Sequence, residues 1–243
     1  MSGPGADATS ACTAWRIEPL GDRALIIEFG SHVDPGVSAR VRAVAQELVR
    51  RPPAGVTDVV PAFTTLALHY RPEAFRGEAP YEALRRGVEA ILAQGVAPQG
   101  AAARVVEIPV HYGGESGPDL EEVAGLCRLA VDEVVARHAA SPHVVHMLGF
   151  APGLPYLAGL DPRLAVPRRA TPRTAVPPGS VAIARDQTVI YPVQIPGGWS
   201  LIGRTPLRLF DPAALPPCLL QPGDRVRFVP IAAETLRAME DRK

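Results

Sequence analysis

Two adjacent glycines, a tryptophan and an arginine stand close together in residues 196–206 (PGGWSLIGRTP). Gly197 and Gly198 leave backbone N–H groups accessible, an arrangement that can hold an anion, and Trp199 offers a large rigid face. Arg204 follows a glycine at a bend and is suited to pair with a carboxylate. Together these residues would recognise a small planar molecule that carries a carboxylate. A glycine hairpin around a buried tryptophan is the structural alternative.

Residues 147–157 (MLGFAPGLPYL) mix glycines and prolines with large apolar side chains, so this run is not a helix. Gly149 and Gly153 permit close approach of the backbone, and Phe150 and Tyr156 are able to wall a pocket. A purely structural loop between strands is the alternative.

Three arginines follow in residues 167–180 (PRRATPRTAVPPGS), a run that its prolines hold extended. Arg168, Arg169 and Arg173 are therefore pre-organised to fork onto a carboxylate or a phosphate. Each alone also fits a solvated loop with surface ion pairs. We expect at least one of the three to be functional.

Three histidines, His138, His143 and His146, invite a comparison with metal sites. Pro142 interrupts the helix that would align them, and no nearby Asp, Glu or Cys completes a ligand set, so we predict no metal. His138, at the end of a predicted helix, is a candidate acid–base group. A helix-capping role is the alternative for this residue.

Lysine is almost absent from the chain, because Lys243 is the single one. Phosphate loops of the GxxxxGK[ST] type, pyridoxal Schiff bases and biotinyl-lysine carriers all need an internal lysine, so the sequence excludes them. If ATP is consumed, either this chain binds it without a standard lysine motif or a partner binds it.

The composition limits the partners and the cellular location. Lys+Arg and Asp+Glu both number 25, so no net charge attracts nucleic acid or an anionic membrane. The apolar runs fall short of the roughly 20 residues that cross a bilayer, and the first residues lack a signal-peptide pattern. We therefore expect a cytoplasmic protein with a frayed N-terminal tail. Cys12, Cys127 and Cys218 lack a CxxC pair, which indicates ordinary thiols.

The N-terminal part alternates strand and helix patterns. Strands are predicted on both sides of a turn at Gly21, and a helix is predicted to start at Pro35. The remaining predicted elements are strands at 56–60 and 64–70, a helix at 81–94 and a strand at 104–110 that would close the sheet. This order predicts a ferredoxin-like α+β domain, placed at residues 14–95 and followed by a linker at 94–103.

The C-terminal part changes in texture after one predicted helix at 119–140. Short strand-like runs separated by Pro and Gly follow, at 144–150, 180–184, 188–192, 200–203, 207–210 and 225–229. Many short strands with turn-rich joints are typical of a closed or nearly closed β-barrel. We place this second domain at residues 104–230.

Residues 112–120, 147–157 and 196–206 resemble the bacterial 5-oxoprolinase B-subunit family, together with short runs at 171–173, 178–181, 187–188 and 190–192. That family also contains the sporulation-kinase inhibitor KipI and the allophanate-hydrolase-subunit-1-like domain of urea carboxylase. The resemblance implies an N-terminal α+β domain and a C-terminal cyclophilin-like β-barrel. It also implies a role in opening 5-oxoproline to glutamate with ATP, but only together with A and C subunits.

The resemblance also suggests site residues. It implies substrate binding by Phe150, Pro152, Tyr156, Gln187, Tyr191, Gly197, Gly198 and Trp199. Arg204, Arg173 and His138 are the catalytic candidates, because arginines balance the charge of a phosphate that activates the lactam carbonyl. A KipI-like inhibitor of a sensor histidine kinase is the alternative function. A peptidyl-prolyl isomerase is a third hypothesis that would rest on the barrel alone.

Overall fold

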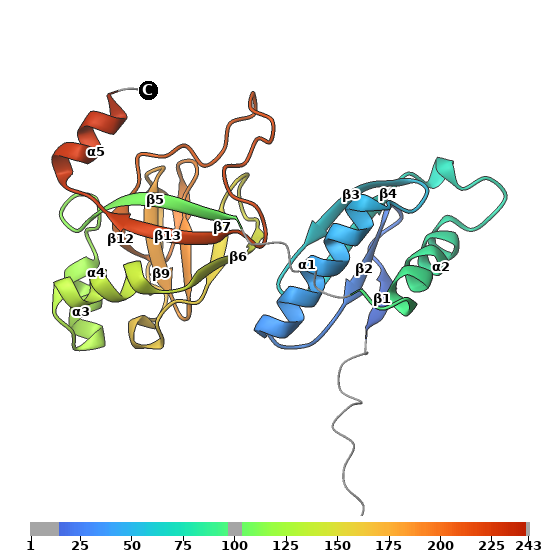
Figure 1. Cartoon of the computed structure of the whole chain (residues 1–243), viewed down its shortest axis with the longest axis horizontal. Coiled ribbons are helices and arrows are strands. Elements are labelled where there is room, and N and C mark those ends of the chain that lie inside the picture. The colour runs from blue at the N-terminus through green and yellow to red at the C-terminus, as the bar shows by residue number, and fades with distance from the viewer. Residues whose placement is uncertain (1–14, 97–103, 242–243) are drawn as a thin grey trace, which may run out of the picture. The chain divides into compact units, whose positions relative to one another are not determined.

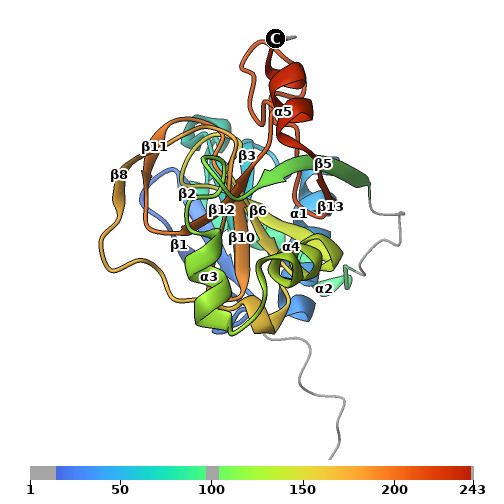
Figure 2. The same cartoon turned by 90° about the vertical axis from the view of Figure 1, so that its left-hand side faces the viewer.

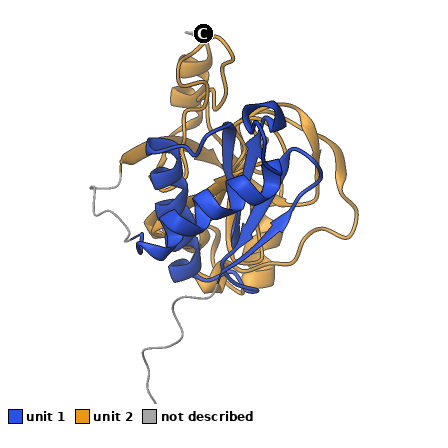
Figure 3. Ribbon diagram, turned by 90° about the vertical axis from the view of Figure 1, so that its right-hand side faces the viewer, with its two compact units in different colours: residues 1–100 blue, residues 101–243 orange. Residues whose placement is uncertain are grey.

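The computed structural model describes residues 15–96 and 104–241, and the chain divides into two compact units. The first unit is Met1–Gly100 and the second is Ala101–Lys243 (Figures 1 and 3). The predicted N-terminal tail lies outside the described residues, as does most of the predicted linker. None of the helices in the described ranges is long and apolar enough to cross a membrane.

The first unit is a four-stranded antiparallel sheet with two helices. Its strands lie in the order β1-β2-β4-β3. Leu25 and Ile27 of the sheet share one buried core with Val44 and Leu48 of α1 and with Leu84 of α2. The elements are β1 (Arg16–Pro19), β2 (Ala24–Glu28), α1 (Pro35–Arg50), β3 (Val56–Pro61), β4 (Thr65–Tyr70), the short 3₁₀ helix η1 (Pro72–Ala74) and α2 (Pro80–Ala93).

The start of α1 is where the sequence predicted it. The carboxylate of Asp34 accepts hydrogen bonds from the N–H groups of Gly36 at 2.8 Å and Val37 at 3.1 Å. Pro35 occupies the first helical position, where its missing N–H costs nothing. The predicted hairpin around Gly21 and the two helices of this unit are also present.

The prediction of a closing strand for the first unit was wrong. β5 (Val105–Tyr112) pairs with strands of the second unit, so no described strand after α2 joins the first sheet. The edge position beside β2 is taken instead by β1. The α+β class therefore holds for this unit, while the ferredoxin-like description stays a prediction.

The second unit is a closed seven-stranded barrel, as predicted, with the strand order β10-β7-β6-β13-β5-β12-β9. β13 runs parallel to β5, and β8 and β11 form a separate ribbon that Figure 2 shows beside the barrel. The strands are β6 (His143–Leu148), β7 (Pro155–Ala158), β8 (Arg173–Val176), β9 (Ser180–Ala184), β10 (Gln187–Ile190), β11 (Ile195–Gly197), β12 (Ser200–Arg204) and β13 (Arg225–Pro230). The helices are α3 (Leu120–Cys127), α4 (Val131–Ala140), the 3₁₀ helix η2 (Pro162–Leu164) and α5 (Ala233–Glu240).

Two predictions for this unit need correction. The single helix at 119–140 is two helices, because Arg128 takes a left-handed backbone with φ of 55° and ends α3. No glycine or proline marks this break in the sequence, which is why the apolar stripe looked continuous. The strand expected at 207–210 forms only one isolated bridge, between Phe210 and Cys218.

Candidate functional site

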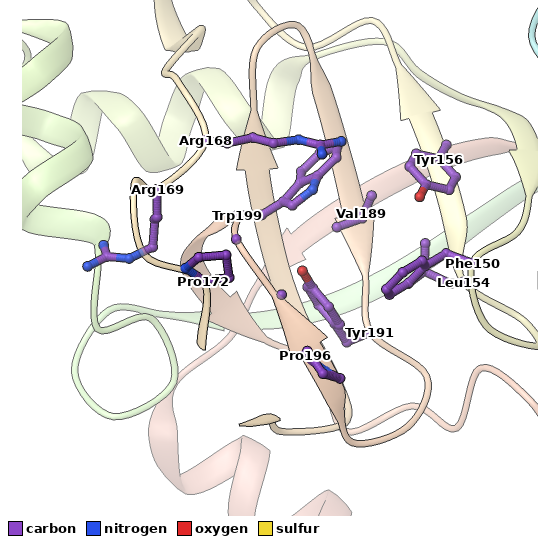
Figure 4. A pocket seen from close by; sticks show the side chains of 12 residues that line it. Phe150, Leu154, Tyr156, Arg168, Arg169, Pro172, Val189, Tyr191, Pro196 and Trp199 are labelled. Carbon is purple, nitrogen blue, oxygen red and sulfur yellow. The ribbon is translucent and has the colours of Figure 1, made fainter. Parts of the chain in front are cut away.

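A small pocket opens on the barrel beside the β8–β11 ribbon. Its volume is about 190 Å³, below the roughly 300 Å³ at which sites for drug-sized ligands begin. The pocket therefore suits a single small ring rather than a nucleotide. Its lining consists of Phe150, Leu154, Tyr156, Arg168, Arg169, Pro172, Val189, Tyr191, Pro196, Gly197, Gly198 and Trp199 (Figure 4).

Aromatic rings form the walls of this pocket. The rings of Tyr156 and Trp199 meet edge to face, with centroids 6.1 Å apart and an angle of 66°. Trp199 is buried on its strand, as is Tyr191. Such walls exclude water on two sides of a flat ligand and leave a face for stacking.

Arg168 supplies the positive charge at the pocket. Its guanidinium carbon lies 5.4 Å from the centre of the Trp199 ring, a cation–π arrangement that Figure 4 shows. With the residues that the structure describes, Arg168 makes no ion pair. Its hydrogen-bond donors are therefore available to an anion in the pocket.

Gly197 is required by the close approach of Tyr191. A Cβ atom at Gly197 would stand 2.2 Å from the hydroxyl oxygen of Tyr191, far inside any allowed contact. Burial raises the pKa of Tyr191 to about 12, so the hydroxyl keeps its proton at neutral pH and can donate a hydrogen bond to a ligand. A Cβ at Gly198 would meet only ordinary contacts, from 3.5 Å outward.

Phe150 stands at the rim of the pocket. It has φ of 69° and is 73% exposed, an uncommon backbone and an uncommon environment for a phenylalanine. The turn between β6 and β7 displays it, and Gly153 makes that turn possible, since a Cβ there would lie 2.8 Å from Phe210 Cβ. Strain of this kind is often found at ligand sites.

Arg169 and Arg173 are engaged by carboxylates. Arg173 donates two hydrogen bonds to Asp119, at 2.7 and 2.9 Å. Arg169 pairs with Asp119 at 3.1 Å and with Glu122 at 2.8 Å. Arg173 is not part of the pocket lining, so its catalytic role stays a prediction that the geometry does not favour.

His138 lies in the barrel core rather than at the pocket. Its ring is fully buried and bonded to the hydroxyls of Tyr112 at 2.8 Å and Thr188 at 3.2 Å. Burial lowers the pKa of His138 well below its usual value and raises the pKa of Tyr112. The structure thus keeps His138 neutral and away from any ligand in the pocket.

These buried histidines predict loss of stability in mild acid. His143 donates to the backbone oxygen of His138 at 3.0 Å, and burial lowers the pKa of His143 from 6.5 to about 4. The unfolded chain takes up this proton near pH 6.5 but the folded chain only near pH 4. The free energy of unfolding should therefore fall across that window as pH decreases, by on the order of 3 kcal/mol from His143. Urea denaturation at several pH values measures the slope, and His143→Gln should flatten it; an unchanged slope in that variant would assign the effect to other groups.

The remaining predicted residues lie outside the pocket lining. Arg204 ends β12 and forms an ion pair with Glu240 of α5. Gln187 begins β10, and Pro152 is exposed in the turn before β7. Six of the predicted binding residues do come together at the pocket, namely Phe150, Tyr156, Tyr191, Gly197, Gly198 and Trp199.

Sequence reasoning missed the apolar lining and one carboxylate. Leu154, Pro172, Val189 and Pro196 line the pocket within or beside the runs that were singled out. Asp119 was quoted only as part of a run, although it is 3% exposed and an acid buried this far needs partners. Among the described residues, no group of His, Cys, Asp and Glu is arranged to hold a metal ion.

The family model for the carboxyltransferase domain, subdomain C and D, matches residues 15–220. The chain is 44% identical to the B subunit of 5-oxoprolinase from Bacillus subtilis, over 93% of this chain and 97% of that one. The Escherichia coli O157:H7 protein of the same name is also 44% identical, over 87% of this chain and 94% of that one. The chain is thus a member of the carboxyltransferase subdomain C and D proteins. Within that class, it belongs to the 5-oxoprolinase B-subunit family.

Solved structures agree with this assignment. The crystal structure of TTHA0988 is 41% identical with a TM-score of 0.74, and the match covers 87% of this chain but only 40% of that longer one. The urea amidolyase of Kluyveromyces lactis shares the fold, with a TM-score of 0.73 at 20% identity over 97% of this chain and 16% of that one. The barrel fits a cyclophilin-like fold.

Proposed function

We propose that this chain is the B subunit of an ATP-dependent 5-oxoprolinase, which opens 5-oxoproline to glutamate together with A and C subunits. The names of its relatives support this proposal, since both describe one subunit of such an enzyme. The observation that carries it in the structure is a ring-sized aromatic pocket with one unpaired arginine, Arg168, at its wall.

The pocket suits the substrate of such an enzyme. 5-Oxoproline is a small lactam ring that carries one carboxylate. In the proposed complex its ring lies between Trp199 and Tyr156, and its carboxylate accepts hydrogen bonds from Arg168. The hydroxyl of Tyr191, whose raised pKa keeps it protonated at neutral pH, donates to an oxygen of the ligand.

The dependence on partners follows from what the pocket lacks. ATP would supply the phosphate that turns the lactam oxygen into a leaving group, and the pocket volume leaves no room for a nucleotide next to the ring. The described residues of the pocket also include no cysteine, serine or histidine nucleophile. This chain therefore binds and orients the ring, while ATP and the activating groups are provided by the A and C subunits.

Reconstitution tests the proposal. We expect the purified chain alone to hydrolyse neither ATP nor 5-oxoproline, and we expect 5-oxoproline-dependent ATP hydrolysis and glutamate formation when the A and C subunits are added. Omitting one component at a time provides the control. Turnover by this chain alone, or a full complex without 5-oxoproline-dependent ATP hydrolysis, would refute the proposal. If the chain instead inhibits autophosphorylation of a sensor histidine kinase, the regulatory alternative holds.

A further inference from the structure

Asp119 is a buried carboxylate that the proposed function leaves without a task. Its side chain is only 5% exposed, and it occupies the residue just before α3, where an aspartate commonly caps the helix. Yet the Asp119 carboxylate accepts no hydrogen bond from the amides of its own helix. It is occupied by arginines and by one distant backbone amide instead.

These contacts join two segments that are remote in the sequence. Arg169 and Arg173 belong to residues 167–173, here called the arginine strap. Both donate to Asp119, Arg173 through two hydrogen bonds and Arg169 through one. The other contact is to β12, where the N–H of Leu201 donates to the same carboxylate at 2.7 Å. Asp119 thus acts as a clamp between the arginine strap and β12.

The same two segments supply facing sides of the pocket. Arg168 is on the arginine strap, and Trp199 immediately precedes β12. Arg168 has no ion pair of its own with the described residues, so its position over Trp199 depends on how its neighbours are anchored. One further anchor exists, a backbone hydrogen bond of 2.8 Å from Arg169 N to Gly198 O.

The glycine-rich run that precedes Asp119 is shaped to deliver it. Gly113 N donates to Ile202 O at 3.1 Å, and Asp119 N donates to Leu201 O at 3.0 Å, so the run lies directly on β12. A Cβ at Gly117 would stand 2.1 Å from Ile202 O, which leaves room only for glycine. The run therefore has a physical purpose that ligand contact does not explain.

We propose that Asp119 is a positioning residue, which clamps the arginine strap to β12 and so holds Arg168 over Trp199 at the spacing that the ligand needs. The identity of the ligand rests on the proposed function, whereas the clamp itself does not. A carboxylate with three charged hydrogen bonds and one amide bond holds its partners far more firmly than a neutral amide of the same shape.

Fluorescence of Trp199 reports the clamp without any substrate. The chain has two tryptophans, and the other, Trp15, belongs to the first unit, so Trp15→Phe leaves Trp199 as the single emitter. In that background Asp119→Asn should raise the acrylamide quenching constant of Trp199 by about twofold, because the covering Arg168 is released. In the assembled enzyme the same substitution should raise KM for 5-oxoproline about tenfold and change kcat by less than about twofold.

Asp224→Asn is the matched control. The Asp224 side chain is 8% exposed, pairs with Arg104 and accepts from Gln221 N at 2.7 Å, so its burial and partners resemble those of Asp119. It lies outside the pocket lining. Both variants should lose thermal stability, but only Asp119→Asn should change the Trp199 quenching and KM. Wild-type quenching and KM in a folded Asp119→Asn protein would overturn the proposal.

Arg173→Gln tests the clamp if Asp119→Asn does not fold, because it leaves Asp119 with Arg169 and Leu201. We expect a raised KM and raised quenching with kcat retained. A fall in kcat at unchanged KM and quenching would instead assign Arg173 to the chemistry and overturn the clamp. A wild-type complex that does not act on 5-oxoproline would refute the proposed function, while the quenching contrast would still decide the role of Asp119.

Discussion

Replacing Arg168 by glutamine should raise KM for 5-oxoproline about 10- to 100-fold in the assembled enzyme. Removing one hydrogen-bond partner from a charged group costs roughly 1.5–3 kcal/mol, and each 1.4 kcal/mol is about tenfold in affinity. Arg168 is the cation over Trp199 and is exposed, so the fold should not depend on it. The thermal midpoint of the isolated chain should therefore stay at the wild-type value. Initial rates over a range of 5-oxoproline concentrations, with a melting curve of the same preparation, measure both quantities.

Arg168→Lys refines this prediction. Lysine keeps the charge but lacks the planar fork and stacks less well on an indole, so we expect an intermediate increase in KM of about tenfold. Arg163→Gln serves as the control, since Arg163 is an exposed arginine of η2 outside the pocket lining. A normal KM in Arg168→Gln would remove this arginine from the substrate site.

Gly197→Ala should abolish most ligand binding through one methyl group. Its Cβ would stand 2.2 Å from the Tyr191 hydroxyl oxygen and 2.8 Å from the ring carbon that bears it, so either the tyrosine or β11 must move. Overpacking of this kind costs about 1–3 kcal/mol of stability, and a displacement near 1 Å at a reacting ligand can cost about a hundredfold in rate. We expect kcat/KM for 5-oxoproline to fall by about a hundredfold while the chain still folds.

Two further variants locate the cause. Adding Tyr191→Phe to Gly197→Ala removes the closest of these contacts and should restore part of the lost stability, so the two changes should not be additive. Gly125→Ala is the control, because a Cβ at this helical glycine meets nothing within 4 Å and should be neutral or slightly stabilising. Equal effects of Gly197→Ala and Gly125→Ala would contradict the close packing described above.

Local sequence was sufficient for the residues of the pocket, because the pocket is built from short runs. Glycines, prolines and aromatics at 147–157 and 196–206 indicate shaped turns, and six residues chosen from these and adjacent runs line the pocket together. Asp34 before Pro35 likewise indicates the start of α1, because capping depends only on neighbours in the chain.

Long-range pairing could not be predicted in this way. Arg173 is bonded to Asp119 across 54 residues, and β5 pairs in parallel with β13, which is more than a hundred residues later. Neither partner is visible in a local pattern, so Arg173 looked free for a substrate and β5 looked like part of the first sheet. His138 was misplaced for the same reason, since its helix position does not reveal that Tyr112 and Thr188 enclose it in the barrel.

The central claim is that the pocket around Arg168 and Trp199 holds 5-oxoproline in the assembled enzyme. The most direct measurement is a structure of the complex of A, B and C subunits with 5-oxoproline bound in the absence of ATP. The account predicts density for one ring beside Trp199, with the ligand carboxylate within hydrogen-bonding distance of the Arg168 guanidinium. A ligand bound at another place, with this pocket empty, would contradict it.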